Sequence, residues 1–216
     1  MSEDQNNKEE QSPADSPPVD AEREAKLKAA AEARAARAAA KAEAEAAEAA
    51  PEEPKPPSPR QPELEAIVAL LKQEIGVSAV EDAYVNELNG DMPVIIVSNS
   101  YWREAAKLLK GHVQLQFNYL RNVSGIDYET HMEVVYHMLS LGSRREVAVK
   151  IKADREAAAV YSATPVWATA NWNEREIYDL LGVDFPGHPD LRRIMMPDDW
   201  VGHPLRKDYE PLDSEV

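Results

Sequence analysis

Cysteine is missing from this chain of 216 residues. Without thiols the chain cannot form a disulfide, and it cannot hold a thiolate-bound iron–sulfur cluster or a zinc ribbon. Glycine is scarce as well, with 8 residues, and no Gly-x-Gly-x-x-Gly or Walker loop is present to bind a nucleotide. The sequence also lacks a Gly-x-Ser-x-Gly elbow, so nothing indicates a nucleophilic hydrolase.

Long apolar runs and concentrated positive charge are also absent. No apolar stretch reaches the roughly 18 residues of a membrane-spanning helix, and the acidic, polar start of the sequence does not resemble a signal peptide. We therefore expect a soluble, cytoplasmic chain that reaches a membrane only through a partner. The net charge is −15, and basic residues are mixed with acidic ones, so nucleic acid is not an expected partner.

Residues 1–62 differ in composition from the rest of the chain. Alanine supplies 17 of the 30 residues from 21 to 50, and Leu27 is the one large apolar residue there. Such a segment has high helix propensity but no stripe to bury, so we expect a disordered arm or a solvated helix, with a partner-binding helix as the alternative. Residues 51–62 form a stiff, proline-rich linker.

Hydrophobic periodicity after the linker predicts three helices and five strands. The first helix starts at Pro62 and ends before Gly76, the second is capped by Ser100 and ends at Lys110, and the last is capped by Thr164 and ends at Gly182. The strands are expected at 83–88, 92–97, 113–119, 131–141 and 146–152, the first two forming a hairpin around Asn89-Gly90. This order predicts an α+β domain, residues 63–182: a two-layer sandwich with helices on one face of a mixed sheet.

Residues 183–216 are predicted to be an extended, irregular tail in which Gly-His-Pro occurs twice. The spacing of His188 and His203 fits no compact metal site, and a proline after each holds the backbone extended. Irregular backbone needs other partners for its polar groups. The tail therefore either lies across another protein or wraps back on its own domain. It offers basic residues that reach carboxylates and apolar residues that anchor a contact: Arg192, Arg193, Arg206 and Lys207; Leu191, Ile194, Met195, Met196, Trp200 and Leu205.

A longer stretch, "NWNEREIYDLLGVDFPGHPDLRRIMMPDDWVGHPLRKDYE", resembles the C subunit of proton-pumping NADH:quinone oxidoreductase, respiratory complex I. The resemblance rests on Glu174-Arg175-Glu176, Tyr178-Asp179 and Gly182, followed by both Gly-His-Pro motifs with their basic residues. It weakens upstream and fades before residue 80. Glu210 lies between Tyr209 and Pro211, where the family usually has proline directly, and the alanine-rich arm is outside the family core.

This resemblance implies a non-catalytic structural subunit of a peripheral arm on the cytoplasmic side of the cell membrane. Electrons would pass from NADH through iron–sulfur clusters of partner subunits to a quinone, coupled to proton translocation. The chain would hold no cofactor or metal and would pack beside the large subunit of the quinone pocket. The resemblance favours docking of the tail on another subunit through these residues: Glu174, Arg175, Glu176, Asp179, His188, Arg192, Arg193, Trp200, His203, Arg206, Lys207 and Asp208.

Three alternatives stay open from the sequence. The first is the equivalent subunit of a membrane-bound hydrogenase, in which a related domain accompanies the large subunit. The second is a free-standing adaptor whose acidic arm recruits partners. The third alternative is an enzyme that acts alone through His188 and His203.

Overall fold

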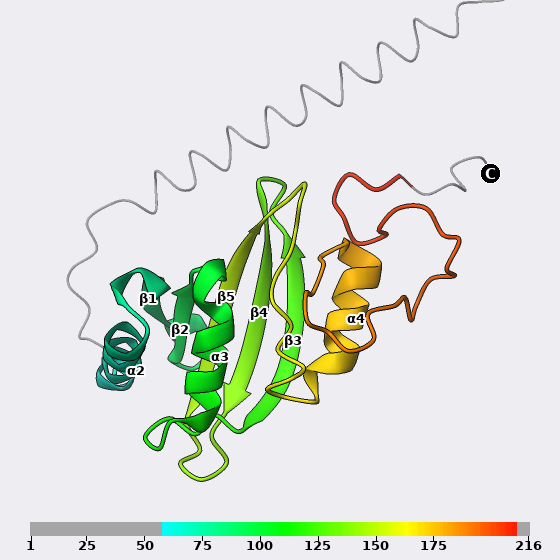
Figure 1. Ribbon diagram of the computed structural model, residues 1–216. Coiled ribbons are helices and arrows are strands. Elements are labelled where there is room, and N and C mark those ends of the chain that lie inside the picture. Colours follow the sequence, from blue (N-terminus) through cyan, green and yellow to red (C-terminus); the bar gives the residue numbers. More distant parts are fainter. Residues whose placement is uncertain (1–57, 211–216) are drawn as a thin grey trace, which may run out of the picture. The chain divides into compact units, whose positions relative to one another are not determined.

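The computed structural model describes residues 58–210, so the predictions for the N-terminal arm fall almost entirely outside the described residues. Figure 1 shows a sheet with helices packed against it. In chain order the helices and strands are α2 (Gln61–Glu74), β1 (Val80–Asn86), β2 (Met92–Val97), α3 (Trp102–Gly111), β3 (Tyr119–Asp127), β4 (His131–Leu139), β5 (Glu146–Asp154) and α4 (Ala170–Leu181).

The five strands form one mixed sheet in the order β1-β2-β5-β4-β3. β2 and β5 pair in parallel, with Ile95 opposite Val149. The other neighbours are antiparallel. The predicted mixed sheet of five strands is therefore confirmed, with β1 and β3 at its edges.

Alternate side chains of β4 and β5 form the centre of the core. Because successive side chains point to opposite faces of a strand, one set faces the helices, and each of its members is at most 1% exposed: Met132, Val134, Tyr136, Met138, Val147, Val149 and Ile151. From the helix layer, α2 contributes Leu64, Ile67 and Leu71, and α3 contributes Trp102, Ala105 and Leu109. The predicted two-layer α+β architecture with helices on one face is confirmed.

α4 packs along the edge strand β3 (Figure 1). A Cβ atom on Gly125 of β3 would lie 2.6 Å from Leu181 Cδ1 and 2.9 Å from Ile177 Cγ2, so a glycine permits this close approach. Asn173 of α4 donates a hydrogen bond to the carbonyl of Val123, and Thr169 donates one to the carbonyl of Leu120. These bonds satisfy carbonyls of an edge strand, which would otherwise need water.

The third predicted strand, residues 113–119, is wrong. Leu115 and Phe117 are 1% and 0% exposed, but Val113, which the alternation placed with them, is 76% exposed. The chain makes a turn here, with Gln116 at a φ of 49°, and Phe117 donates its N–H to the carbonyl of Leu109. A turn that points two side chains inward imitates the alternation of a strand. The strand itself runs from Tyr119 to Asp127.

The first strand runs from Val80 to Asn86 rather than over 83–88, and two helix starts also differ from the prediction. α4 begins at Ala170 rather than after Thr164, whose hydroxyl donates to the carboxylate of Glu174 instead. α3 begins at Trp102 without a side-chain cap, so Ser100 does not cap it. The predicted end of α4 is confirmed, because Gly182 adopts a left-handed φ of 71°. Within residues 58–210, no helix has the length and apolar character needed to cross a bilayer.

Candidate interaction site: three buried carboxylates shape the C-terminal segment

Residues 183–210, here called the C-terminal segment, follow α4 and fold around it (Figure 1). The segment starts inside the core, where Val183 and Phe185 are each 1% exposed, and Asp184 forms an isolated bridge with Ala159. From there to residue 210 it contains neither helix nor strand. Its polar backbone groups therefore need partners outside regular secondary structure. Two buried carboxylates, Asp179 and Asp127, accept four of its backbone N–H groups, and a third, Glu174, binds the loop before α4.

Asp179 of α4 is fully buried and organises residues 193–196. Its Oδ2 accepts the backbone N–H groups of Ile194, Met195 and Met196 at 3.0, 2.6 and 3.0 Å. Its Oδ1 accepts a hydrogen bond from Arg193 at 3.1 Å. Burial pushes the pKa of Asp179 upward, but the three N–H groups and Arg193 outweigh it and hold the pKa below its usual value. The carboxylate is thus the centre on which this coil is folded.

Glu174, which precedes Asp179 on α4 and is also 0% exposed, binds the loop before the helix. It accepts hydrogen bonds from the Ser162 hydroxyl, the Ala163 N–H and the Thr164 hydroxyl at 2.6, 2.6 and 2.9 Å. Burial raises the pKa of Glu174, although these donors partly oppose it. The charged form therefore costs free energy in this site.

His188, from the first Gly-His-Pro, lies against Glu174. The N–H of Asp190 donates to Nδ1 at 3.0 Å, so Nδ1 carries the lone pair and Nε2 carries the proton. Nε2 then points to the carbonyl of Asn171 at 3.3 Å and to Glu174 Oε2 at 3.9 Å. Burial lowers the pKa of His188, which favours this neutral form. The imidazole therefore binds protein groups in the described fold.

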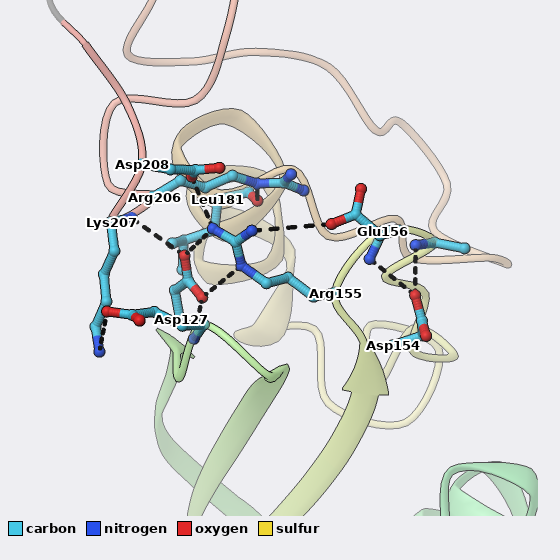
Figure 2. Close-up of polar contacts among 10 residues, drawn as sticks. Asp127, Asp154, Arg155, Glu156, Leu181, Arg206, Lys207 and Asp208 are labelled. Carbon is cyan, nitrogen blue, oxygen red and sulfur yellow. Dashed lines mark hydrogen bonds and ion pairs between the residues drawn. The ribbon is translucent and has the colours of Figure 1, made fainter. Parts of the chain in front are cut away.

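Asp127, at the end of β3, forms the third cluster (Figure 2). Arg155 makes two parallel hydrogen bonds to its carboxylate, each 2.9 Å long, and a third to Asp208 at 2.7 Å. The backbone N–H of Lys207 donates to Asp127 Oδ2 at 3.1 Å. Arg155 lowers the pKa of Asp127 far below its usual range and also lowers that of Asp208. The cluster joins β3, the end of β5 and residues 207–208.

The second Gly-His-Pro region caps the C-terminus of α4. The last carbonyls of a helix have no partner within it. Here His203 Nδ1 donates to the carbonyl of Asp179 at 3.0 Å, the Leu205 N–H to that of Leu180 at 3.0 Å, and Arg206 Nε to that of Leu181 at 2.7 Å. Figure 2 shows Arg206 reaching Leu181. The imidazole of His203 lies over Gly182, where a Cβ would be 2.5 Å from Nε2.

The remaining predicted interface residues, on α4 and in the C-terminal segment, differ in exposure. Arg192 is exposed and pairs with Asp190 at 3.0 Å, Glu176 is exposed, and Trp200 is half-buried. Arg175 is 8% exposed and donates to the carbonyl of Arg192. Sequence reasoning did not identify Asp127, Arg155 or Ser162, because their partners are 80, 53 and 12 residues away. No local motif signals such pairs.

Several apolar side chains of the C-terminal segment stay exposed after these contacts are made. Met195, Val201 and Leu205 are 63%, 79% and 59% exposed. On α4, Trp172 is 66% exposed. The segment therefore has an ordered inner side that binds its own domain and an outer side with free apolar groups.

The fold and these clusters define a class: a small α+β domain that carries a long C-terminal segment shaped by internal ion pairs. Residues 95–215 match the family model described as "Respiratory-chain NADH dehydrogenase, 30 Kd subunit". This match covers more than half of the sequence, so the chain belongs to that family.

Relatives with similar sequences agree with this family. The chain is 41% identical over 143 residues to the C subunit of NADH-quinone oxidoreductase from Roseiflexus sp. (strain RS-1), a match that covers 64% of this chain and 81% of the relative. It is 45% identical over 125 residues to the protein of the same name from Moorella thermoacetica, covering 55% of this chain and 80% of the relative.

Two solved structures are similar in fold. The trypsin-resistant fragment of Nqo5 is 27% identical, with a TM-score of 0.50 over 59% of this chain and 98% of the fragment. A chain of the archaeal membrane-bound sulfane sulfur reductase, a respiratory membrane complex, has a TM-score of 0.57 at 20% identity over 70% of this chain and 88% of that chain.

Proposed function

We propose that this chain is a structural subunit of NADH-quinone oxidoreductase and that its C-terminal segment docks on a neighbouring subunit. In this proposal the complex passes electrons from NADH through iron–sulfur clusters to a quinone and couples this to proton translocation. The family match is the observation that carries the proposal. The chain contributes position rather than chemistry, and it has no cysteine to hold a cluster itself.

The internal carboxylates give the proposal a physical mechanism. An unstructured segment that folds on binding loses conformational entropy at that moment, which weakens the contact. Within the chain itself, Asp179 orders residues 193–196 and Asp127 orders residues 207–208. Glu174 orders residues 162–164 before the helix. Docking then needs only the outer side, where Met195, Val201 and Leu205 are exposed. A preshaped segment holds a neighbour more rigidly than a floppy one.

The proposed neighbour is the large subunit that helps to form the quinone pocket, on the cytoplasmic side of the membrane. Clusters and quinone belong to partner subunits, and contact with the membrane is made through the complex. The predicted interface residues remain predictions: those on the inner side act by shaping the segment, and those on the outer side act by contact.

A tagged full-length copy in its own cells tests this proposal. Purification from solubilised membranes should recover NADH-quinone oxidoreductase subunits with NADH:quinone activity. Replacing Met195 and Leu205 together by serine should reduce the amount of intact complex, because both side chains are exposed on the outer side. Leu88→Ser is the matched control, since Leu88 is fully exposed and lies outside the segment. Recovery of the wild-type chain alone would contradict the proposal and favour a free-standing adaptor.

A further inference from the structure

Arg175 has an incomplete set of partners. Two other arginines, Arg155 and Arg193, each bind a buried carboxylate. Arg175 is 8% exposed, and no carboxylate of residues 58–210 forms an ion pair with it. Its Nε donates to the carbonyl of Arg192 at 3.3 Å, and the guanidinium carbon lies 4.9 Å from the centre of the Trp172 ring. The terminal nitrogens of this guanidinium thus have no hydrogen-bond partner within residues 58–210, and they are not enclosed in the domain.

Trp172 adds a second, independent signal beside this charge. It precedes Arg175 by three residues on α4, so both side chains lie on the same side of the helix. The indole is 66% exposed, although a ring of this size contributes strongly to stability when it is buried. Tryptophan and arginine are the residue types that most often dominate the binding energy of protein interfaces. The ring therefore lies where a partner surface would bury it.

We propose that Trp172 and Arg175 form an anchor for a partner protein that presents an aspartate or glutamate to the guanidinium and an apolar recess to the indole. A carboxylate matches the planar fork of arginine and would neutralise the charge. The projecting indole favours a protein over a small anion, because only a larger surface can enclose it. This anchor rests on the proposed docking function and names the chemistry of the partner.

The surroundings of the anchor agree with an acidic partner group. Arg192, whose backbone carbonyl contacts Arg175, is also a cation, but its guanidinium already pairs with Asp190. Its carbonyl holds Arg175 Nε, which leaves the terminal nitrogens of Arg175 for another acceptor. A partner carboxylate would thus meet one unpaired cation.

Photo-crosslinking in the assembled complex tests the anchor. A photoreactive phenylalanine derivative replaces Trp172 in the tagged full-length chain, and the complex is purified and irradiated. We expect a crosslink to a peptide of another subunit that contains an aspartate or glutamate. The same probe at Leu88, which is fully exposed, is the matched control and should not label that peptide. A crosslink confined to this chain, to a second copy of it or to lipid overturns the proposal, as does the absence of a crosslink.

Charge reversal provides the second test. Arg175→Glu should lower the amount of chain retained in the complex at least tenfold, and changing the crosslinked acidic residue of the partner to arginine should restore it. Because Arg175 is largely buried, the melting temperature of the free chain is measured in parallel. Trp172→Ala, at an exposed position, should fold normally and still lose retention. Normal retention of both variants overturns the anchor.

The two proposals fail in distinguishable ways. If the wild-type chain purifies in a different assembly, the proposed function is wrong, and the crosslink at Trp172 in that assembly decides the anchor. If the wild-type chain is in NADH-quinone oxidoreductase but position 172 crosslinks to no other subunit, only the anchor is wrong.

Discussion

At the scale of single residues, a buried carboxylate replaces secondary structure as the partner of backbone N–H groups. Asp179 accepts three consecutive N–H groups and one guanidinium nitrogen. An unpaired buried N–H costs roughly 1–3 kcal/mol, so an apolar side chain at this position would leave the coil without its main support. This explains why an acidic residue lies inside the helix packing of α4.

Asp179→Asn should lower the free energy of unfolding by about 3 kcal/mol. The change removes one member of a buried ion pair and leaves Arg193 uncompensated. Urea unfolding monitored by fluorescence measures the effect. Asp190→Asn is the control, because the Asp190–Arg192 pair is exposed and such pairs contribute at most about 1 kcal/mol. Equal effects of the two substitutions would show that Asp179 has no special structural role.

Glu174 should make stability depend on pH in the opposite direction from Asp127 and Asp179. Its folded pKa is raised by burial, so its contribution is present below the unfolded pKa of about 4.3 and is lost as pH rises through the folded pKa. The folded pKa values of Asp127 and Asp179 are lowered. Their contributions are present above about pH 3.9 and are lost as pH falls through the folded values.

Comparison of wild type with Glu174→Gln isolates the first effect. The amide stays neutral, so the free energy of unfolding of wild type should fall relative to the variant as pH rises from about 4.3 through the raised folded pKa of Glu174. Urea titrations across this range measure the difference. Glu176→Gln, on the exposed side of the same helix, should show a flat difference. A flat result for Glu174→Gln as well would contradict a raised pKa.

At the scale of elements, the sequence predicted periodic segments well and segments shaped by distant contacts poorly. The alternation of β4 and β5 and the stripe of α2 encode their own burial, so these elements were found. Residues 113–117 also alternate, yet their inward side chains come from a turn against α3. Thr164-Pro165 carries a helix-start signal, but Glu174 binds that loop and α4 starts later. Tertiary contacts decided both cases.

Gly182 should be needed for its left-handed backbone and for the space that it leaves to His203. A substitution at Gly90 distinguishes these two requirements. Both adopt left-handed conformations, with φ of 71° and 63°, but a Cβ on Gly182 would meet His203, whereas one on Gly90 would meet nothing within 4 Å. Alanine at either position should cost about 1 kcal/mol of backbone strain. Gly182→Ala alone should also speed trypsin cleavage after Arg206 and Lys207 at least tenfold, measured by mass spectrometry. Equal cleavage of both variants would contradict the idea that a Cβ at position 182 displaces His203.

The packing of α4 on β3 gives a second prediction at this scale. Gly125→Ala would bring a methyl group within 2.6 Å of Leu181 Cδ1 and 2.9 Å of Ile177 Cγ2. Overpacking of this kind costs about 1–3 kcal/mol, so the thermal midpoint should fall. Gly142→Ala is the control, because that position is open. An unchanged midpoint for Gly125→Ala would mean that α4 shifts freely.

At the scale of the whole molecule, the Asp127 cluster connects parts of the chain that are far apart in sequence. Arg155→Met should leave Asp127 without its guanidinium and free Asp208, so amide exchange at residues 206–208 should accelerate at least tenfold. Amides of β4 should keep their protection. Arg144→Met, at an exposed position, should change nothing. Hydrogen exchange followed by mass spectrometry resolves these regions, and unchanged exchange at 206–208 would count against the cluster.

In the candidate site, too, the sequence predicted some features and missed the contacts between distant residues. Gly-His-Pro and the basic residues distinguish the C-terminal segment, and the sequence predicts twelve interface residues, eight in this segment and four on α4. The sequence did not reveal that ten of these side chains would bind groups of the chain itself: Glu174, Arg175, Asp179, His188, Arg192, Arg193, His203, Arg206, Lys207 and Asp208. Spacing alone does not distinguish a partner in the same chain from one in another.

The bond from Lys207 to Asp127 spans 80 positions of the chain. During synthesis the ribosome adds roughly 5–20 residues each second, so Asp127 and Arg155 emerge several seconds before residues 207 and 208. For that interval the sheet can already assemble while α4 has bare carbonyls at its end. A nascent chain stalled before residue 203 would therefore offer chaperones an uncapped helix, and release of the finished polypeptide would close it.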